Sequence, residues 1–132
     1  MKTKIRMILF LSILTFIACE DSNEIIPINE SDKLIGSWIN PIETDNGLKL
    51  TRVNDLNKDE YGISFLTNKE CIERSSGWCG TPPITFFDFQ GTWTRNDMII
   101  TISIDNGIDG LVDIKWEIKS LNDEYLIIER LE

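Results

Sequence analysis

The chain has 132 residues, a length that suits one small domain. Its 22 acidic residues outnumber the 13 basic ones, and the formal net charge is −9. Such an acidic protein repels phosphate backbones, so it is not expected to bind nucleic acid. The chain contains no histidine, which excludes Ser-His-Asp and Cys-His catalytic systems and histidine-bearing zinc sites.

Residues 1–18 have the layout of a secretory signal peptide. Three positive charges, on Lys2, Lys4 and Arg6, precede an uncharged apolar run over residues 7–18. This run is too short to cross a bilayer core of about 30 Å as a helix, which takes roughly 20 apolar residues. The sequence therefore predicts export and not a membrane-spanning anchor.

The end of the apolar run, Phe-Ile-Ala-Cys at residues 16–19, resembles the lipobox of bacterial lipoproteins. In that family a small residue precedes an invariant cysteine, whose thiol receives a diacylglycerol before the signal peptidase cuts. The resemblance implies that Cys19 becomes the mature N-terminus and carries lipid. Phe16 departs from the leucine usual at its position. The alternative is an ordinary secreted protein whose first cysteine falls here by chance.

Residues 19–33 are acidic, contain Pro27 and show no periodicity, so they predict a flexible tether. Acidic residues directly after the lipidated cysteine resemble the surface-export signal of lipoproteins from Bacteroidota-type bacteria. In other Gram-negative groups an aspartate near this position instead signals inner-membrane retention. We expect a protein of the bacterial cell envelope that is held in the outer membrane by its N-terminal lipid.

Two cysteines remain once Cys19 is acylated, and they lie in an oxidising compartment. Cys71 and Cys79 flank residues 72–78, whose Ser-Ser-Gly centre suits a turn. We therefore predict a structural disulfide between Cys71 and Cys79. Residues 78–83 superficially resemble the thioredoxin motif, but Pro82 stands where the second cysteine would be, so dithiol exchange within that motif is excluded.

The mature chain reads as short strands separated by Asn, Asp and Gly clusters. About eight extended runs alternate apolar and polar residues, and none has a helical period. The short links at residues 95–97, 105–110 and 121–123 predict antiparallel hairpins. We therefore expect an all-β domain over residues 34–132. The favoured architecture is an antiparallel up-and-down meander of about eight strands that closes into a small barrel, and the alternative is a two-sheet β-sandwich.

The same alternation predicts which side chains face the barrel interior. Leu66 competes with Phe65 for that face, and Tyr125 and Ile127 compete in the last strand. The predicted inward residues are Trp38, Phe65, Phe87, Phe89, Trp93, Ile100, Ile102, Ile114, Trp116, Ile118, Leu126 and Ile128.

Several segments of the domain resemble known proteins. Residues 34–38, Leu-Ile-Gly-Ser-Trp, are similar to the Gly-x-Trp first strand of lipocalins. Together with residues 61–65, 77–84 and 91–93, they resemble small lipocalin-like lipoproteins of Bacteroidota over roughly residues 34–131. The resemblance implies a lipocalin-like barrel and a location in the cell envelope. The chain is shorter than full lipocalins and lacks their C-terminal helix, which argues against a large ligand cavity.

Two acidic loops have weak metal-site patterns. Residues 55–59 have the oxygen spacing that opens an EF-hand loop, but Glu60 replaces the required glycine and Leu66 the bidentate glutamate. Residues 105–110 offer two carboxylates, and a hairpin turn is favoured there over a calcium site. No carboxylate pair is marked for catalysis. We therefore expect no enzymatic activity, no cofactor and no metal site.

Aromatic residues on the strand faces leave two functional interpretations. Core packing is favoured for the tryptophans, since each can bury about 150–250 Å². The alternative is a site for a small apolar ligand. Trp78 lies in the loop beside Cys79, where it either covers one barrel end or contacts a partner. The candidate ligand-binding residues are Trp38, Phe87, Phe89, Trp93 and Trp116.

Two classes of function follow. The first is a monomeric ligand-binding module that holds one small apolar molecule near the envelope. The second is an envelope structural or protein-interaction module whose barrel is filled by its own side chains. The interior distinguishes them, because a ligand needs a connected cavity of a few hundred Å³.

The lipobox yields the first testable prediction. Cys19→Ser should release the protein from membranes into the soluble envelope fraction, because the acylated thiol is lost. Fractionation and immunoblotting measure this. Equal membrane partitioning of the variant and the wild type would contradict the lipid anchor.

Overall fold

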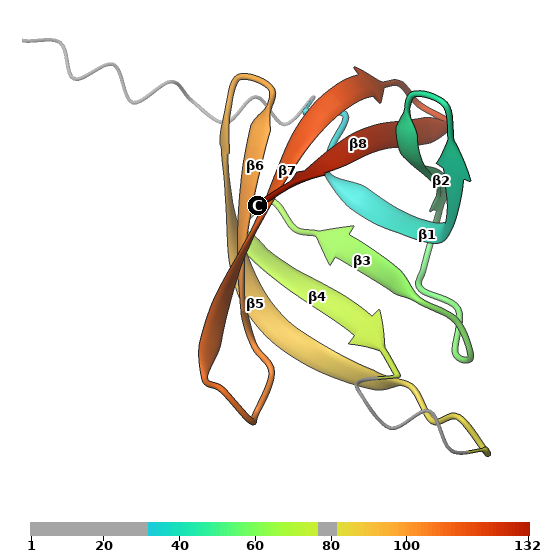
Figure 1. Cartoon of the computed structure of the whole chain (residues 1–132), viewed down its shortest axis with the longest axis vertical. Helices are drawn as coiled ribbons and strands as arrows, with labels where there is room; N and C mark the ends of the chain where they lie inside the picture. Colours follow the sequence, from blue (N-terminus) through green and yellow to red (C-terminus); the bar gives the residue numbers. More distant parts are fainter. Residues whose placement is uncertain (1–31, 77–81) are drawn as a thin grey trace, which may run out of the picture.

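The computed structural model describes residues 32–76 and 82–132, which contain eight β-strands and, within these ranges, no helix (Figure 1). Short Asn, Asp and Gly turns separate the strands, as the composition of the links predicted. The strands are β1 (Gly36–Thr44), β2 (Gly47–Val53), β3 (Gly62–Phe65), β4 (Glu70–Ser75), β5 (Phe87–Asn96), β6 (Ile99–Asp105), β7 (Leu111–Leu121) and β8 (Tyr125–Leu131).

The strands form one closed barrel in the order β1-β2-β8-β7-β6-β5-β4-β3, and all neighbouring pairs are antiparallel. This confirms the predicted all-β barrel over the sandwich. β3 to β8 follow one another as a meander, and the β1–β2 hairpin completes the ring by joining β2 to β8 and β1 to β3. Residues 54–61 therefore cross from β2 to β3 past β1, which lies between these two strands.

A β-bulge in β1 changes which side chains face inward. Ile39 pairs with Thr51, but the next pair joins Ile42 to Lys49, so β1 has one more residue than β2 in this interval. Asn40 takes a φ of 55°, in the left-handed region that asparagine tolerates better than most residues. As a result, Glu43 and not Ile42 continues the inner face, and Ile42 is exposed.

The barrel interior is filled by apolar side chains from all eight strands and from the segment before β1. Most predicted inward residues are buried, including Phe65 in place of Leu66. Five core residues were missing from the prediction: Leu34, Leu50, Ile63, Cys71 and Ile104. The core consists of Leu34, Trp38, Leu50, Ile63, Phe65, Cys71, Trp93, Ile100, Ile102, Ile104, Trp116, Ile118, Leu126 and Ile128.

Phe87 is a correction to the predicted interior, because its side chain is 57% exposed. Alternation places it correctly with Phe89, but the β5–β6 pairing begins only at Gly91. The first residues of β5 therefore have β4 on one side and no strand on the other, and they project beyond the end of β6. Phe89 and Ile114 are partly buried against the core.

The described strands and Leu34, just before β1, together close and fill the barrel. Each strand has a partner on both sides, and the core residues of the described ranges extend from residue 34 to residue 128. Residues 20–132 include all of these elements, and we expect this part of the chain to fold on its own.

Trp116→Ala should lower the free energy of unfolding by about 3–5 kcal/mol, because Trp116 is 2% exposed and its removal leaves a cavity. Urea denaturation of residues 20–132 measures the change. Phe87→Ala is the matched control, with an expected loss below about 1 kcal/mol for a side chain on the surface. Equal losses for the two variants would contradict the register of β7.

Candidate functional site

One end of the barrel is closed by residues 32–35, which we call the strap. Arg52 on β2 donates a hydrogen bond to the carbonyl of Ile35 at 2.9 Å, and Arg95 on β5 pairs with Asp32 at 2.6 Å. β2 and β5 lie on opposite sides of the ring, so the strap bridges the barrel. Leu34, at the centre of the strap, is fully buried and belongs to the core.

Two of the candidate ligand-binding tryptophans belong to this closed end. The Trp38 indole donates to the carbonyl of Leu34 at 2.8 Å, and the Trp93 indole donates to the carbonyl of Leu66 at 3.1 Å. Trp93 also packs edge-on against Phe65, with ring centroids 5.5 Å apart. Because both indoles are buried and their N–H groups are bonded within the protein, Trp38 and Trp93 act as core residues here.

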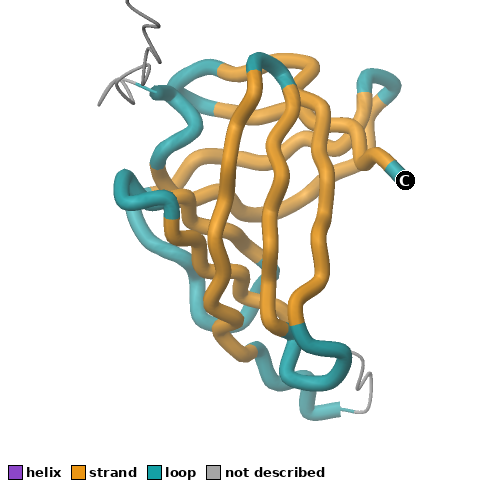
Figure 2. The backbone as a smooth tube through the Cα atoms, turned by 90° about the vertical axis from the view of Figure 1, so that its left-hand side faces the viewer, coloured by secondary structure: helices purple, strands orange, loops and turns teal. Residues whose placement is uncertain are grey.

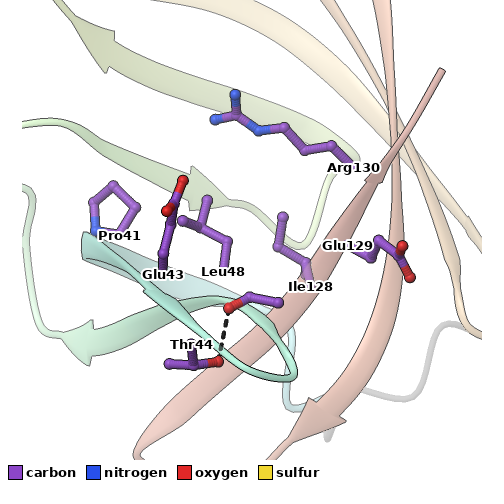
Figure 3. Close-up of a pocket in the computed structure, with 8 residues that line it drawn as sticks. Pro41, Glu43, Thr44, Leu48, Ile128, Glu129 and Arg130 are labelled. Atoms are coloured by element: carbon purple, nitrogen blue, oxygen red, sulfur yellow. Dashed lines mark hydrogen bonds between the residues drawn. The ribbon is translucent and has the colours of Figure 1, made fainter.

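The opposite end of the barrel has a pocket of about 540 Å³. Figure 2 shows the strands running between the two ends, where the loops gather. The pocket lies where the β1–β2 hairpin meets β8, and the register aligns Glu43 with Leu48 and Leu48 with Ile128 on one face. The pocket is lined by Pro41, Glu43, Thr44, Gly47, Leu48, Ile128, Glu129 and Arg130 (Figure 3).

The apolar part of this pocket is formed by Leu48, Ile128 and Pro41. In Figure 3 the side chains of Leu48, Ile128 and Glu43 point to the same side of the hairpin, and Arg130 extends from β8 above them. Alternation along β8 places Arg130 on the same face as the buried Leu126 and Ile128, but Arg130 lies near the end of the strand and is exposed. The pocket lining therefore combines apolar side chains with one cation, Arg130, and two carboxylates, Glu43 and Glu129.

Arg130 has no hydrogen bond or ion pair with any residue in the described ranges. The three other described arginines are all engaged: Arg52 with strap carbonyls, Arg74 with Asp88, and Arg95 with Asp32. Across the β7–β8 pair, Arg130 is the register partner of Trp116. The Trp116 indole nitrogen is buried and, within the same ranges, has no hydrogen-bond partner. Two donors without acceptors therefore occupy adjacent positions.

A hydrogen-bonded pair lies near Arg130. The Tyr61 hydroxyl, just before β3, donates to Glu73 on β4 at 2.9 Å. The pKa of Tyr61 is raised far above its usual range. Burial is the largest cause and the neighbouring Glu73 carboxylate is the second, whereas the positive charge of Arg130 lowers the pKa. Tyr61 therefore stays a neutral donor at physiological pH and leaves Arg130 without a phenolate partner.

The predicted disulfide is not found. Cys71 is a free cysteine, fully buried in the core, and Cys79 lies outside the described residues. Cys71 is the second residue of β4 and faces the barrel interior, whereas the prediction placed it at the edge of a turn. Burial, together with the Glu73 charge, raises the pKa of the Cys71 thiol to about 11.

The remaining predicted residues have separate positions. Phe89 is partly buried against the core, Phe87 is exposed, and Trp116 is a buried core residue that does not line the pocket. Cys19 and Trp78 lie outside the described residues. The loop at residues 105–110 is a hairpin turn, in which the Asn106 side chain accepts from two backbone N–H groups. In the described part of the chain no cluster of three metal-ligating side chains occurs.

Sequence reasoning missed Arg130 and Glu43. Arg130 had a signal, because it continues the inward series of Leu126 and Ile128 by one more step. Glu43 had no such signal, because the alternation of inward and outward side chains along β1 is shifted by the bulge at Asn40, which forms only when β1 pairs with β2.

Comparison with known proteins adds no relative, since no family model, curated protein or solved structure matches the chain. Over the ranges that the structure covers, no helix has the length and apolarity needed to traverse a bilayer.

Cys71 provides a test of the core assignment. In folded residues 20–132 its thiol should resist alkylation at pH 8, because it is buried and its pKa is raised to about 11. In urea without reductant it should react fully, as peptide mapping by mass spectrometry would detect. A Cys71 that reacts in urea only after reduction would instead be disulfide-bonded.

Proposed function

We propose that this chain is a lipid-anchored, non-enzymatic protein of the bacterial cell envelope whose barrel binds one small apolar ligand at its open end. The observation that carries this proposal is the pocket of about 540 Å³ beside Leu48 and Pro41, whose volume is within the range of known ligand sites. Depressions of about 360 Å³ and 610 Å³ also lie beside the strap, where Leu34 and the Trp38 and Trp93 side chains are buried.

The sequence supports the proposed location in the cell envelope. The signal-peptide layout, the lipobox resemblance at Cys19 and the acidic tether all favour anchoring by lipid. The strap begins at Asp32, shortly after this tether, and is tied to both sides of the barrel through Arg52 and Arg95. An anchor at Cys19 would therefore connect to the packed end and not to the pocket.

A binding role, as opposed to catalysis, is supported by the chemistry of the pocket. The chain has no histidine to act as a base near neutral pH. The nearby Tyr61 is held protonated by burial and by its bond to Glu73, so it is a poor base as well. Donors and apolar surface in this arrangement suit recognition.

A second candidate is a protein-interaction module, and exposed apolar side chains favour it. Ile108 is 82% exposed and Leu111 is 74% exposed in and beside the β6–β7 loop, and Phe87 projects from the start of β5. Apolar side chains that gather into one exposed patch mark sites of protein contact. This candidate needs no ligand in the pocket.

A neutral fluorescent probe, N-phenyl-1-naphthylamine, distinguishes the two candidates. Residues 20–132 should bind one equivalent with increased emission, and Leu48→Gln should weaken binding about 10-fold or more by placing an amide on the pocket floor. Leu111→Gln is the control and should leave binding unchanged. Failure of the wild type to bind would reject the ligand-binding proposal, and loss with Leu111→Gln alone would move binding to the exposed loop.

A further inference from the structure

We infer that β7 binds an extended segment of a partner protein along its edge at residues 111–114, and that this segment alternates apolar and basic side chains. The segment adds one strand to the sheet beside β7. This inference rests on the second candidate function, to which it adds the binding surface and the chemistry of the partner, and it needs no ligand in the pocket. It is carried by an unpaired strand edge, by exposed apolar side chains on that edge and by negative charge around it.

The edge exists because the two strands beside β7 cover different lengths of it. β6 pairs with β7 as far as the pair of Asp105 with Leu111. The pairing of β8 with β7 ends earlier, at the pair of Leu131 with Lys115. Figure 1 shows β7 continuing past the C mark, where β8 ends. Residues 111–114 therefore have a strand on one side only. Every second residue of such an edge turns its backbone N–H and C=O away from the sheet, where an added strand can bond to them.

The edge carries apolar side chains that are open to solvent. Leu111 is 74% exposed and Val112 is 37% exposed, and Ile114 is only partly buried against the core. Alternation along β7 puts Val112 and Ile114 on the inner face of the sheet, where Val112 is the register partner of the buried Ile104. A strand added beside β7 would cover these side chains with its own inward residues. Apolar side chains are therefore expected on that face of the partner segment.

The end of β1 and the start of β5 also have unpaired stretches, but they differ from the edge of β7. The end of β1 has no partner on its β3 side, and it contains the bulge at Asn40 and Pro41, which has no N–H to donate. The start of β5 carries Asp88, whose charge is paired with Arg74. Residues 111–114 contain no bulge, proline or lysine, which are the usual means of blocking a strand edge.

Negative charge gathers around this edge. Residues 105–114 contain three aspartates, Asp105, Asp109 and Asp113, and no lysine or arginine. None of the three forms an ion pair with another described residue. Asp113 is exposed and lies on the outer face of β7, so it would be next to the outward side chains of an added strand. Opposite charges on neighbouring strands attract, which favours lysine or arginine at those positions of the partner.

The same charges disfavour a second copy of this chain as the partner. Pairing of two such edges would bring the aspartates of one hairpin close to those of the other, and each chain has a formal net charge of −9. Like charges opposite one another on neighbouring strands are destabilising. A basic segment of a different protein is therefore the occupant that fits the edge.

Synthetic peptides test this inference. A fluorescein-labelled peptide, Lys-Val-Lys-Val-Lys-Val-Lys, should bind the purified protein one to one, as fluorescence anisotropy measures. The matched peptide with glutamate in place of lysine should bind at least about 10-fold more weakly, because it is repelled by the aspartates. Equal binding of the two peptides would overturn the basic chemistry of the partner. No binding of the lysine peptide, while N-phenyl-1-naphthylamine still binds, would overturn this inference and leave the ligand-binding proposal standing.

Matched variants place the peptide on β7. Asp113→Lys should weaken binding of the lysine peptide about 5- to 20-fold, because repulsion replaces attraction. Asp59→Lys makes the same change of charge at an exposed position in the crossover between β2 and β3, and should have less than about a 2-fold effect. Both aspartates are exposed, so neither change disturbs the core. Equal effects of the two variants would mean that only the overall charge attracts the peptide, and would overturn the inference.

N-methylated peptides distinguish strand addition from attraction by charge alone. Alternate residues of an extended peptide turn their N–H groups to the same side, so methylating either the valines or the lysines blocks one edge of the peptide. One of the two methylated peptides should lose binding at least about 10-fold, and the other should keep it within about 3-fold. Hydrogen exchange followed by NMR should also slow at alternate amides of residues 111–114 in the complex. Equal losses with both methylated peptides, or no slowing at these amides, would overturn strand addition.

Discussion

The fold depends on filling the interior of an eight-stranded barrel with side chains from every strand. Phe65 lies at the centre of this packing, edge-on to Trp93 at 5.5 Å and to Trp116 at 6.3 Å between ring centroids. Edge-to-face contacts of this kind orient aromatic rings and add to the free energy of burial. β3 has only four residues, and all four are buried, so the shortest strand is held by its packing as much as by its hydrogen bonds.

The two ends of the barrel differ in how the core is covered. At the strap, Arg52 lies over the Trp38 ring at 4.2 Å and Lys69 lies over the Trp93 ring at 3.9 Å. Cations therefore cover the aromatic core where it approaches solvent, while their charged heads stay accessible to water. At the other end the pocket lies beside Leu48, which is half-buried, and Ile128 is fully buried.

Several charged side chains form ion pairs on the outer surface of the barrel. Arg74 pairs with Asp88 across β4 and β5, where its hydrogen bonds hold the pKa of that carboxyl below its usual range. Lys119 on β7 bonds to both Glu117 and Glu129, which raises the pKa of the lysine. These pairs lie on the outer surface and contribute little to stability individually.

The sequence by itself determined the strand pattern, because alternation of apolar and polar residues has the period of a pleated strand. It identified the eight strands, the hairpin turns and nine of the twelve predicted inward residues as fully buried: Trp38, Phe65, Trp93, Ile100, Ile102, Trp116, Ile118, Leu126 and Ile128. The signal-peptide layout and the lipobox resemblance at residues 1–19 are also features of the sequence, and the export and lipidation that they imply stay predictions.

Only the tertiary structure decided what depends on pairing between strands. The bulge at Asn40 turns Glu43 inward, and the late start of the β5–β6 pairing leaves Phe87 exposed. The inward register of β4 makes Cys71 a core thiol, although its spacing from Cys79 had suggested a bridge. Arg130 and Trp116 become neighbours through the β7–β8 register. Register and strand ends are set by packing between distant segments, which local patterns do not contain.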